Sequence, residues 1–450
     1  GIAEKLVMKA MSKSSGIPLK KIEDEYNKDG DLGQTAENIL QQKIQTTFTS
    51  ETITLEKVYH TLLKIANLEG KGSQEMKMRH ISSILNDATP KEAKFILKIL
   101  LGTLRLGIAE NTVMDALAIA FTGKKENREI IENAYNVSSD LGKVAQVLSK
   151  RGITEITKFQ VQLFNPIRPM LADRIKSEED TVKKFQDEFA AEYKLDGERA
   201  QIHKQKDMIL IFSRSLENIT SYYPDIVEKI SKSIISDDVI LEAEVVAMNT
   251  NTGDFLPFQE LMHRRRKHEI DDAVSKYPIS VNFFDVLFSD NKNCMDMKYT
   301  DRRRLLEKII KEDEFARLIP MSIISNEEQV LETLENSINS GCEGLMLKHL
   351  NSVYKAGIRG SNWLKLKREY QNELGDSLDL VVIGAFFGKG RRTGKYGTLL
   401  LATYNDEEDI FPSICKVGTG FSDESLDQLY QILSPKVTLK KNPRIVSEMK

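Results

Sequence analysis

The spacing of apolar residues along the chain changes twice. From the start to Phe164, apolar residues recur at helical spacing, most clearly over residues 91–121, where the pattern breaks near Gly107 and then resumes. Two prolines within residues 165–170 then interrupt regular structure, which indicates a linker. We therefore predict an all-helical domain over residues 1–164.

The middle of the chain has strand-like runs that alternate with helical patterns. The strand-like runs cover residues 190–194, 209–212, 239–247, 279–288 and 344–348. This mixture predicts an α+β domain over residues 165–372, made of antiparallel sheets with helices.

Short strands separated by glycine-rich or acidic turns fill the end of the chain. The runs at residues 378–387, 398–404 and 414–417 favour a small β-barrel, and the third predicted domain covers residues 373–450. The 75 residues after Gly375 are few for a closed barrel with decoration, so we expect this domain to be incomplete.

Composition narrows the class of protein. With 40% hydrophobic and 29% charged residues, the chain can form several cores, which excludes overall disorder. Three scattered cysteines are too few for a disulfide framework or a CxxC metal site, so we expect a reducing, cytoplasmic setting. No apolar run approaches the roughly 20 residues that span a bilayer, and no signal peptide opens the chain, so no membrane partner is expected. The first residue is Gly1, which suggests a trimmed chain whose helical domain lacks its N-terminal part.

The net charge of −3 says little about nucleic-acid binding, because the local field matters more than the total. Two local basic runs occur, at residues 263–268 and 386–397. A single run of this kind is as compatible with a solvated face as with a nucleic-acid site.

The most informative stretch begins at Glu192. Lys194 ends a strand, Asp196 and Gly197 form a tight turn, and Arg199 opens the returning strand. The stem of the lysine is therefore held by a strand while its amine is exposed at one end of a sheet. Taken alone, this Lys-x-Asp-Gly pattern is compatible with an ordinary hairpin turn.

Further candidates follow along the middle domain. Glu244 lies in an otherwise apolar strand, where an unpaired charge would be costly. Lys365 and Lys367 alternate so that both fall on one face of a strand. The remaining candidates are an arginine between two serines, an aromatic residue within a strand and a carboxylate at a strand start: Arg214, Phe284 and Glu343.

This ordered series resembles the nucleotidyltransferase motifs of ATP-dependent DNA ligases, which mRNA capping enzymes and RNA ligases share more loosely. The resemblance is strongest to the archaeal and eukaryotic replicative type, and it extends to residues 105–110 (RLGIAE), 169–172 (PMLA) and 418–422 (GTGFS). It implies a helical DNA-binding domain, an adenylation (nucleotidyltransferase) domain and an OB-fold domain.

The resemblance also implies a role for each matching residue. Lys194 corresponds to the lysine that becomes adenylylated, Glu192 to the residue that recognises adenine, and Phe284 to the aromatic that stacks on the ring. The other implied nucleotide contacts are Arg199, Arg214 and Arg359 around the ribose and phosphates, Lys365 and Lys367 at the α-phosphate, and Glu244. Glu244 and Glu343 also match the carboxylates that bind the metal.

Two positions depart from the family pattern. Leu195 stands where this type often has tyrosine, although that side chain is expected to point away from the lysine. The family's last motif, a basic segment that orients the leaving pyrophosphate, is not recognisable before Lys450.

Physical chemistry agrees with these roles. A lysine attacks phosphorus only as the free amine, and neighbouring cations lower its pKa. Mg²⁺ prefers oxygen ligands, which suits two carboxylates on separate strands. The alternative for Glu244 and Glu343 is a structural ion pair with a buried arginine.

We therefore expect an ATP-dependent DNA ligase that uses ATP and Mg²⁺. It would seal nicks in double-stranded DNA through lysyl-AMP and 5′-adenylylated DNA, for replication, repair and recombination. A non-catalytic DNA clamp and a capping or RNA-ligating enzyme are the alternatives, and whether ADP replaces ATP stays open. We expect a monomer, cytoplasmic and nucleoid-associated if archaeal. A sliding clamp is a further candidate partner, although no clamp-binding motif is recognisable.

The break between two predicted helices provides the candidate DNA contacts, Arg105 and Gly107. A glycine there lets backbone amides approach phosphates, and the next helix begins close by. The alternative is that Gly107 only permits the turn.

Overall fold

The computed structural model describes residues 2–43, 51–68, 70, 72–104, 107–249, 253–264, 270–367, 379–388, 392–438 and 440–447. The chain divides into two compact units, one formed by Gly1–Ile108 with Asp376–Lys450 and the other by Ala109–Gly375. Arg105, one of the candidate DNA contacts, lies outside the described residues. Among the described residues, no helix has the length and apolar character needed to cross a membrane.

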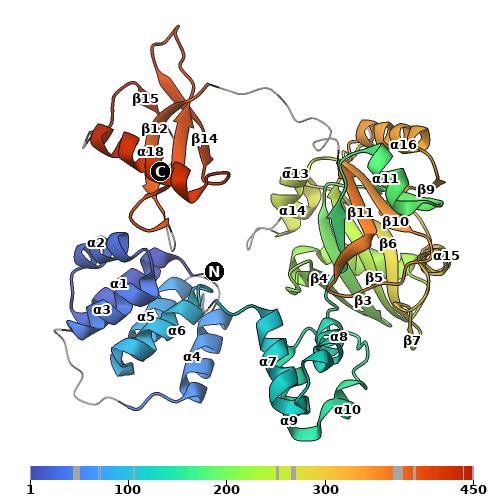
Figure 1. The fold of residues 1–450 in the computed structure, drawn as a ribbon, viewed down its shortest axis with the longest axis horizontal. Coiled ribbons are helices and arrows are strands. Elements are labelled where there is room, and N and C mark those ends of the chain that lie inside the picture. The colour runs from blue at the N-terminus through green and yellow to red at the C-terminus, as the bar shows by residue number, and fades with distance from the viewer. Residues whose placement is uncertain are drawn as a thin grey trace. The chain divides into compact units, whose positions relative to one another are not determined.

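Helices form the N-terminal part, as the apolar spacing predicts (Figure 1). They are α1 (Glu4–Ser15), α2 (Leu19–Asp29), α3 (Leu32–Gln41), α4 (Leu55–Asn67), α5 (Ser73–Asp87) and α6 (Pro90–Leu100). Their core is aliphatic and includes Val7, Met11, Ile22, Ile39 and Leu97. The predicted break is confirmed, because α6 ends before Gly107 and the next helix begins after it.

Four more helices open the second unit and pack on one another (Figure 1). They are α7 (Glu110–Thr122), α8 (Arg128–Ser138), α9 (Leu141–Arg151) and α10 (Ile153–Ile156). They belong to the same compact unit as the strands that follow. The domain boundary expected at residue 164 stays a prediction.

Two sheets form the rest of this unit. The first has the order β1 (Leu171–Arg174), β11 (Arg359–Lys367), β10 (Gly344–His349), β2 (Phe189–Lys194), β9 (Met321–Ile324). The second has the order β4 (Met208–Ser213), β3 (Glu198–Gln205), β5 (Asp238–Ala247), β6 (Ile279–Ser289), β7 (Lys292–Asn293), and β8 (Ala316–Leu318) pairs with β6. All five strand-like runs of the middle region are confirmed as strands. The pairing is antiparallel as expected, with two exceptions: β1 with β11 and β6 with β8 are parallel.

Amphipathic helices cover the sheets. α11 (Glu178–Phe185) and α16 (Glu327–Asn339) bury apolar residues against the first sheet, and α12 (Pro224–Ser233) and α15 (Tyr299–Ile309) bury theirs against the second. A third cluster joins residues of both sheets, among them Met170, Leu195, Phe284 and Trp363. The site described below borders this cluster.

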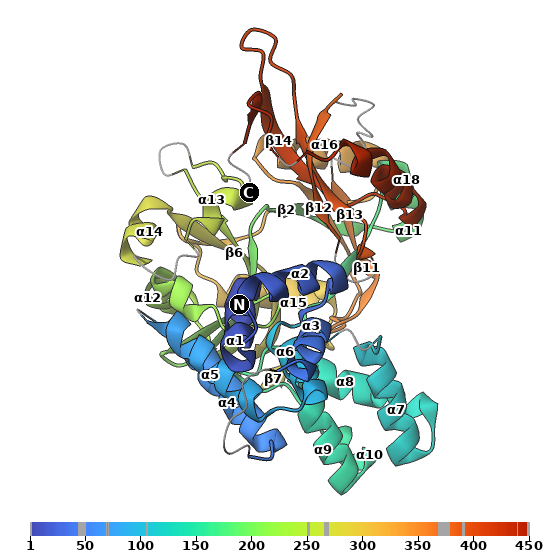
Figure 2. The same cartoon turned by 90° about the vertical axis from the view of Figure 1, so that its left-hand side faces the viewer.

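The C-terminal part contains a small sheet with one helix beside it (Figure 2). Its strands are β12 (Val381–Phe387), β13 (Tyr396–Ala402), β14 (Phe411–Val417) and β15 (Ile445–Val446), and the helix is α18 (Asp423–Leu433). The three predicted strands are confirmed, and their described ends lie within three residues of the predicted ones. Residue 378, the predicted start of the first strand, lies outside the described residues. The assignment of this sheet to an OB-fold stays a prediction.

Candidate nucleotide site

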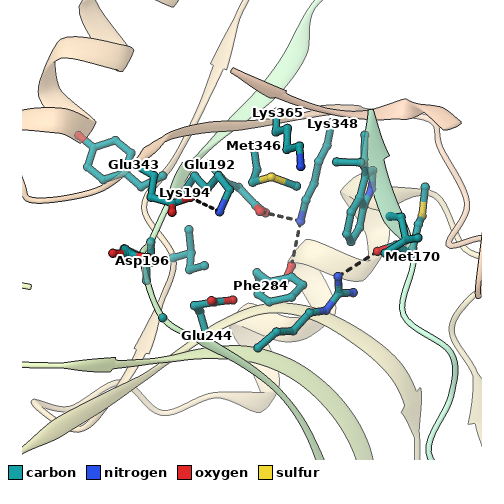
Figure 3. Close-up of a pocket in the computed structure, with 18 of the residues that line it drawn as sticks. Met170, Glu192, Lys194, Asp196, Glu244, Phe284, Glu343, Met346, Lys348 and Lys365 are labelled. Atoms are coloured by element: carbon teal, nitrogen blue, oxygen red, sulfur yellow. Dashed lines mark hydrogen bonds and ion pairs between the residues drawn. The ribbon is translucent and has the colours of Figure 1, made fainter. Parts of the chain in front are cut away.

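All ten core residues proposed from the sequence line one pocket of about 340 Å³ (Figure 3). Residues of both sheets contribute: Lys194 ends β2, Lys365 and Lys367 lie on β11, and Glu244 lies on β5. Arg214 follows β4 and is exposed, and Arg359 opens β11, where its Nη1 donates to the carbonyl of Ala172 at 2.8 Å. The residues identified from the sequence are therefore brought together by the fold across as many as 175 positions, from Glu192 to Lys367.

The turn after Lys194 is tightly constrained. The Asp196 carboxylate accepts a hydrogen bond from the backbone N–H of Phe258 at 3.1 Å. A Cβ atom at Gly197 would lie 2.3 Å from the carbonyl oxygen of Val245, so only glycine fits there. This requirement explains the Asp-Gly pair physically and fixes where β2 delivers its terminal lysine.

Lys194, Glu343 and Lys367 form what we call the lysine cluster. Glu343 Oε2 lies 2.6 Å from Lys194 Nζ and 2.9 Å from Lys367 Nζ. Burial alone would raise the pKa of Glu343, but its bonds with the two lysines outweigh this effect and hold that pKa below its usual value. The Lys194 side chain remains 23% exposed, so a ligand in the pocket can reach it.

Cations affect one another at this end of the pocket. Burial lowers the pKa of Lys365, and the positive charges of Arg174, Lys194, Arg359 and Lys367 lower it further. The positive potential predicted around Lys194 is therefore present. It favours the binding of phosphate groups.

Glu244 is a carboxylate without a close ion-pair partner among the described residues. Burial raises its pKa to about 7, with Lys194 and Arg199 opposing that rise. No ion pair within 4 Å involves its carboxylate among the described residues, and Glu343 pairs with lysines rather than with a buried arginine. The structural ion pair that was the alternative for Glu244 occurs instead at Glu242, two residues earlier on β5.

Arg199, Glu242 and Tyr354 form what we call the arginine cluster. Arg199 donates from Nη2 to Glu242 Oε2 and from Nη1 to the backbone carbonyl of Met170 at 2.9 Å. The Tyr354 hydroxyl lies 3.0 Å from Glu242 Oε2 and 3.3 Å from Arg199 Nη2. Glu242 and Tyr354 are almost completely buried, and neither was proposed from the sequence.

Glu192 is also held by residues that the sequence did not single out. Its carboxylate accepts a hydrogen bond from the Tyr299 hydroxyl at 2.6 Å. It also pairs with Lys348 Nζ at 2.6 Å (Figure 3). Lys348 lies 4.3 Å from the ring centroid of Trp363 and 5.0 Å from that of Phe284. Burial lowers the pKa of Lys348, although Glu192 opposes that shift. Lys348 carried one signal: it is a lysine at the end of an otherwise apolar strand.

Three family models match consecutive parts of the chain. The DNA ligase N terminus matches residues 1–118, the ATP dependent DNA ligase domain residues 169–367, and the ATP dependent DNA ligase C terminal region residues 392–449. The DNA ligase of Nitrosopumilus maritimus (strain SCM1) is 69% identical over all of this chain and 76% of its own length. The chain belongs to the ATP-dependent DNA ligase family.

A more distant relative and a solved structure also match this chain. The DNA ligase of Sulfolobus acidocaldarius is 42% identical over all of this chain and 77% of its own length. The solved structure named Pmar-Lig_Pre shares the fold, with a TM-score of 0.54 at 17% identity over 95% of this chain and 91% of that one. The model of the ATP dependent DNA ligase domain spans the whole pocket, from Met170 to Lys367.

Gly107 lies outside the pocket, in the loop before α7. Its φ is +71°, and a Cβ atom there would meet nothing within 4 Å. The backbone is thus accessible, and the glycine is required for its left-handed conformation. Both interpretations of Gly107, a phosphate contact and a permissive turn, remain open.

Proposed function

We propose that this chain seals nicks in duplex DNA by an ATP-dependent reaction in which AMP is carried on Lys194. The lysine cluster carries this proposal, because a reachable lysine surrounded by cations and carboxylates suits phosphoryl transfer better than passive binding. A non-catalytic clamp would gain nothing from a nucleophile in that position.

Adenylylation begins with release of Lys194 from Glu343 and loss of one proton from its ammonium group to water, and the nitrogen loses a second proton to water once the P–N bond has formed. The free amine attacks the α-phosphorus of ATP, a P–N bond forms, the bond to the β-phosphate oxygen breaks, and pyrophosphate leaves. Lys365 and Lys367 lie where they would stabilise the charge that develops on the α-phosphate oxygens. Phe284 would stack on the adenine, Glu192 would read its amino group, and Arg199, Arg214 and Arg359 would contact the ribose and phosphates.

Glu244 and Glu343 would hold Mg²⁺. The fit rests on their chemistry: both carboxylates line the pocket, and the Glu244 carboxylate forms no ion pair within 4 Å among the described residues. When bound, Mg²⁺ neutralises charge on the phosphate oxygens.

The later steps use DNA. AMP moves from Lys194 to the 5′-phosphate of the nick, and the 3′-hydroxyl then attacks that phosphorus and expels AMP. The helical region before residue 164 would grip the duplex through phosphate contacts, with Arg105 and Gly107 as candidates, and an OB-fold in the C-terminal region would add a second DNA surface. A monomeric state, a sliding-clamp partner and a nucleoid location stay predictions.

The test is incubation with α-labelled ATP or GTP, followed by a sealing assay on a nicked duplex. We expect label from ATP on the wild-type chain, no label on Lys194→Ala, and sealing by the wild type only. Label from GTP in preference to ATP would favour a capping enzyme. Nick binding without any label would favour the non-catalytic clamp.

A further inference from the structure

Tyr354 lies in the loop between β10 and β11, and 4% of its surface is exposed. Its hydroxyl meets three polar partners that belong to three different parts of the fold. It receives the backbone N–H of Met170 at 2.9 Å and Arg199 Nη2 at 3.3 Å, and it donates to Glu242 Oε2 at 3.0 Å. A tyrosine hydroxyl offers one donor and two acceptor sites, so its whole capacity is used.

Two of these partners are walls of the nucleotide pocket. Arg199 and Met170 both line it, and Arg199 also bonds the Met170 carbonyl, so the hydroxyl closes a ring between the two residues. Glu242 compensates the charge of Arg199 from behind. Arg199 Nε is buried and has no hydrogen-bond partner among the described residues, so the guanidinium is held through its two Nη atoms.

The loop that carries Tyr354 is itself anchored. Arg302, fully buried on α15, forms two hydrogen bonds with Asp285, at 2.7 and 3.1 Å. It also donates to the carbonyl of Ser352, two residues before Tyr354, at 3.2 Å. Arg302 thus links the loop of Tyr354 to β6, the strand that supplies Phe284 to the pocket.

We infer that Tyr354 is a positioning residue for adenylylation, whose hydroxyl aims the Arg199 guanidinium and the Met170 backbone at the bound nucleotide. The inference rests on the proposed function, in which Arg199 contacts the ribose and phosphates of ATP. Tyr354 acts through Arg199 and does not touch the reacting atoms. Loss of its hydroxyl leaves Arg199 with a weaker hold and the Met170 N–H without an acceptor.

The experiment measures the single-turnover rate constant of Lys194 adenylylation at saturating ATP in the full chain. We expect Tyr354→Phe to lower this rate constant about tenfold. The control is Tyr223→Phe, because Tyr223 is equally buried and donates to a buried carboxylate, Glu198, at 2.6 Å. This control should lose stability but keep the wild-type rate constant, since a rate constant does not depend on the folded fraction.

A second arm repeats Tyr354→Phe in an Arg199→Lys background, where we expect less than a twofold further loss. A wild-type rate constant in Tyr354→Phe, or an undiminished tenfold loss in the Arg199→Lys background, overturns the inference. If Tyr354→Phe does not fold, Glu242→Gln tests the same link, with the same expected loss and a wild-type rate again overturning it. Absence of label on the wild-type chain refutes the proposed function as well, whereas the other outcomes leave that function intact.

Discussion

The lysine cluster lines the nucleotide pocket with all three of its members, whereas the arginine cluster reaches the pocket only through Arg199, and the two clusters differ in burial. In the lysine cluster, 18–25% of each side chain is exposed, and one carboxylate is shared by two ammonium groups. In the arginine cluster, Glu242 is 1% exposed, and every oxygen and hydroxyl that faces Arg199 is committed to a partner. Water or a ligand can replace Glu343 as the partner of Lys194, which suits a lysine that must react. Glu242 is buried and hydrogen-bonded, which suits its role of holding Arg199 in place.

The largest expected effect is at the reacting lysine. Lys194→Ala should abolish formation of the covalent AMP adduct and leave the fold intact, because the side chain is partly exposed and belongs to no apolar core. Labelled ATP and thermal unfolding measure the two effects. If labelled AMP still attached to the variant, another residue would be the nucleophile.

The effect of burial on an ion pair can also be tested outside the two clusters, at the buried pair of Arg302 and Asp285. Arg302→Met leaves Asp285 as an unpaired buried charge and should lower the free energy of unfolding by about 3–5 kcal/mol. Arg304 on the same helix is the control: its side chain is 76% exposed, and Arg304→Met should cost less than about 1 kcal/mol. Urea unfolding measures both, and equal losses in the two variants would contradict the role assigned to burial.

Lys365→Ala and Lys367→Ala should each slow adenylylation about 10–100-fold, somewhat less than loss of an oxyanion donor in other enzymes, because several cations share the site. Nick binding should be unchanged. Lys355, exposed in the preceding loop, provides the control substitution to alanine. Weak nick affinity with normal adenylylation would place the two lysines on the DNA surface instead.

The smallest effect is on the pH dependence of stability. His203 is buried, and burial lowers its pKa from 6.5 to about 3. Its Nδ1 accepts a hydrogen bond from the backbone N–H of Phe164 at 3.0 Å, so the folded state requires the neutral ring. Because the pKa of His203 is lower in the folded state than in the unfolded state, its contribution to the free energy of unfolding is complete above pH 6.5. That contribution is lost as the pH falls toward 3.

Between these values the loss approaches about 1.4 kcal/mol per pH unit. His203→Gln should remove the pH dependence of stability that His203 causes. The free energy of unfolding of the variant should therefore fall less than that of the wild type between pH 6.5 and 5.5. Urea titrations at the two pH values provide the measurement. Parallel losses in both proteins would show that other groups dominate.

Much of this protein follows from its sequence alone. Apolar periodicity predicted the helical N-terminal part, several of the strands and the break before α7, because local spacing decides which face of an element is buried. The residues of the lysine cluster were identifiable through the resemblance to the ligase motifs, which contain the amine, the carboxylates and the cations that phosphoryl transfer needs. The sequence indicated a tight turn at Gly197, whereas the close approach of the Val245 carbonyl that requires glycine there is visible only in the tertiary structure.

The supporting residues needed the tertiary structure. Glu242, Lys348 and Tyr354 act through contacts with residues that are distant in sequence, such as Lys348 with Glu192, 156 residues away, and Tyr354 with Met170, 184 residues away. Apart from the lysine at the end of an apolar strand, nothing in their local sequence distinguishes these partners from ordinary strand or loop residues. The parallel pairs β1 with β11 and β6 with β8, and the pairing of Arg199 with Glu242 rather than Glu244, also depend on the tertiary structure. Register and burial are set only when distant segments pack together.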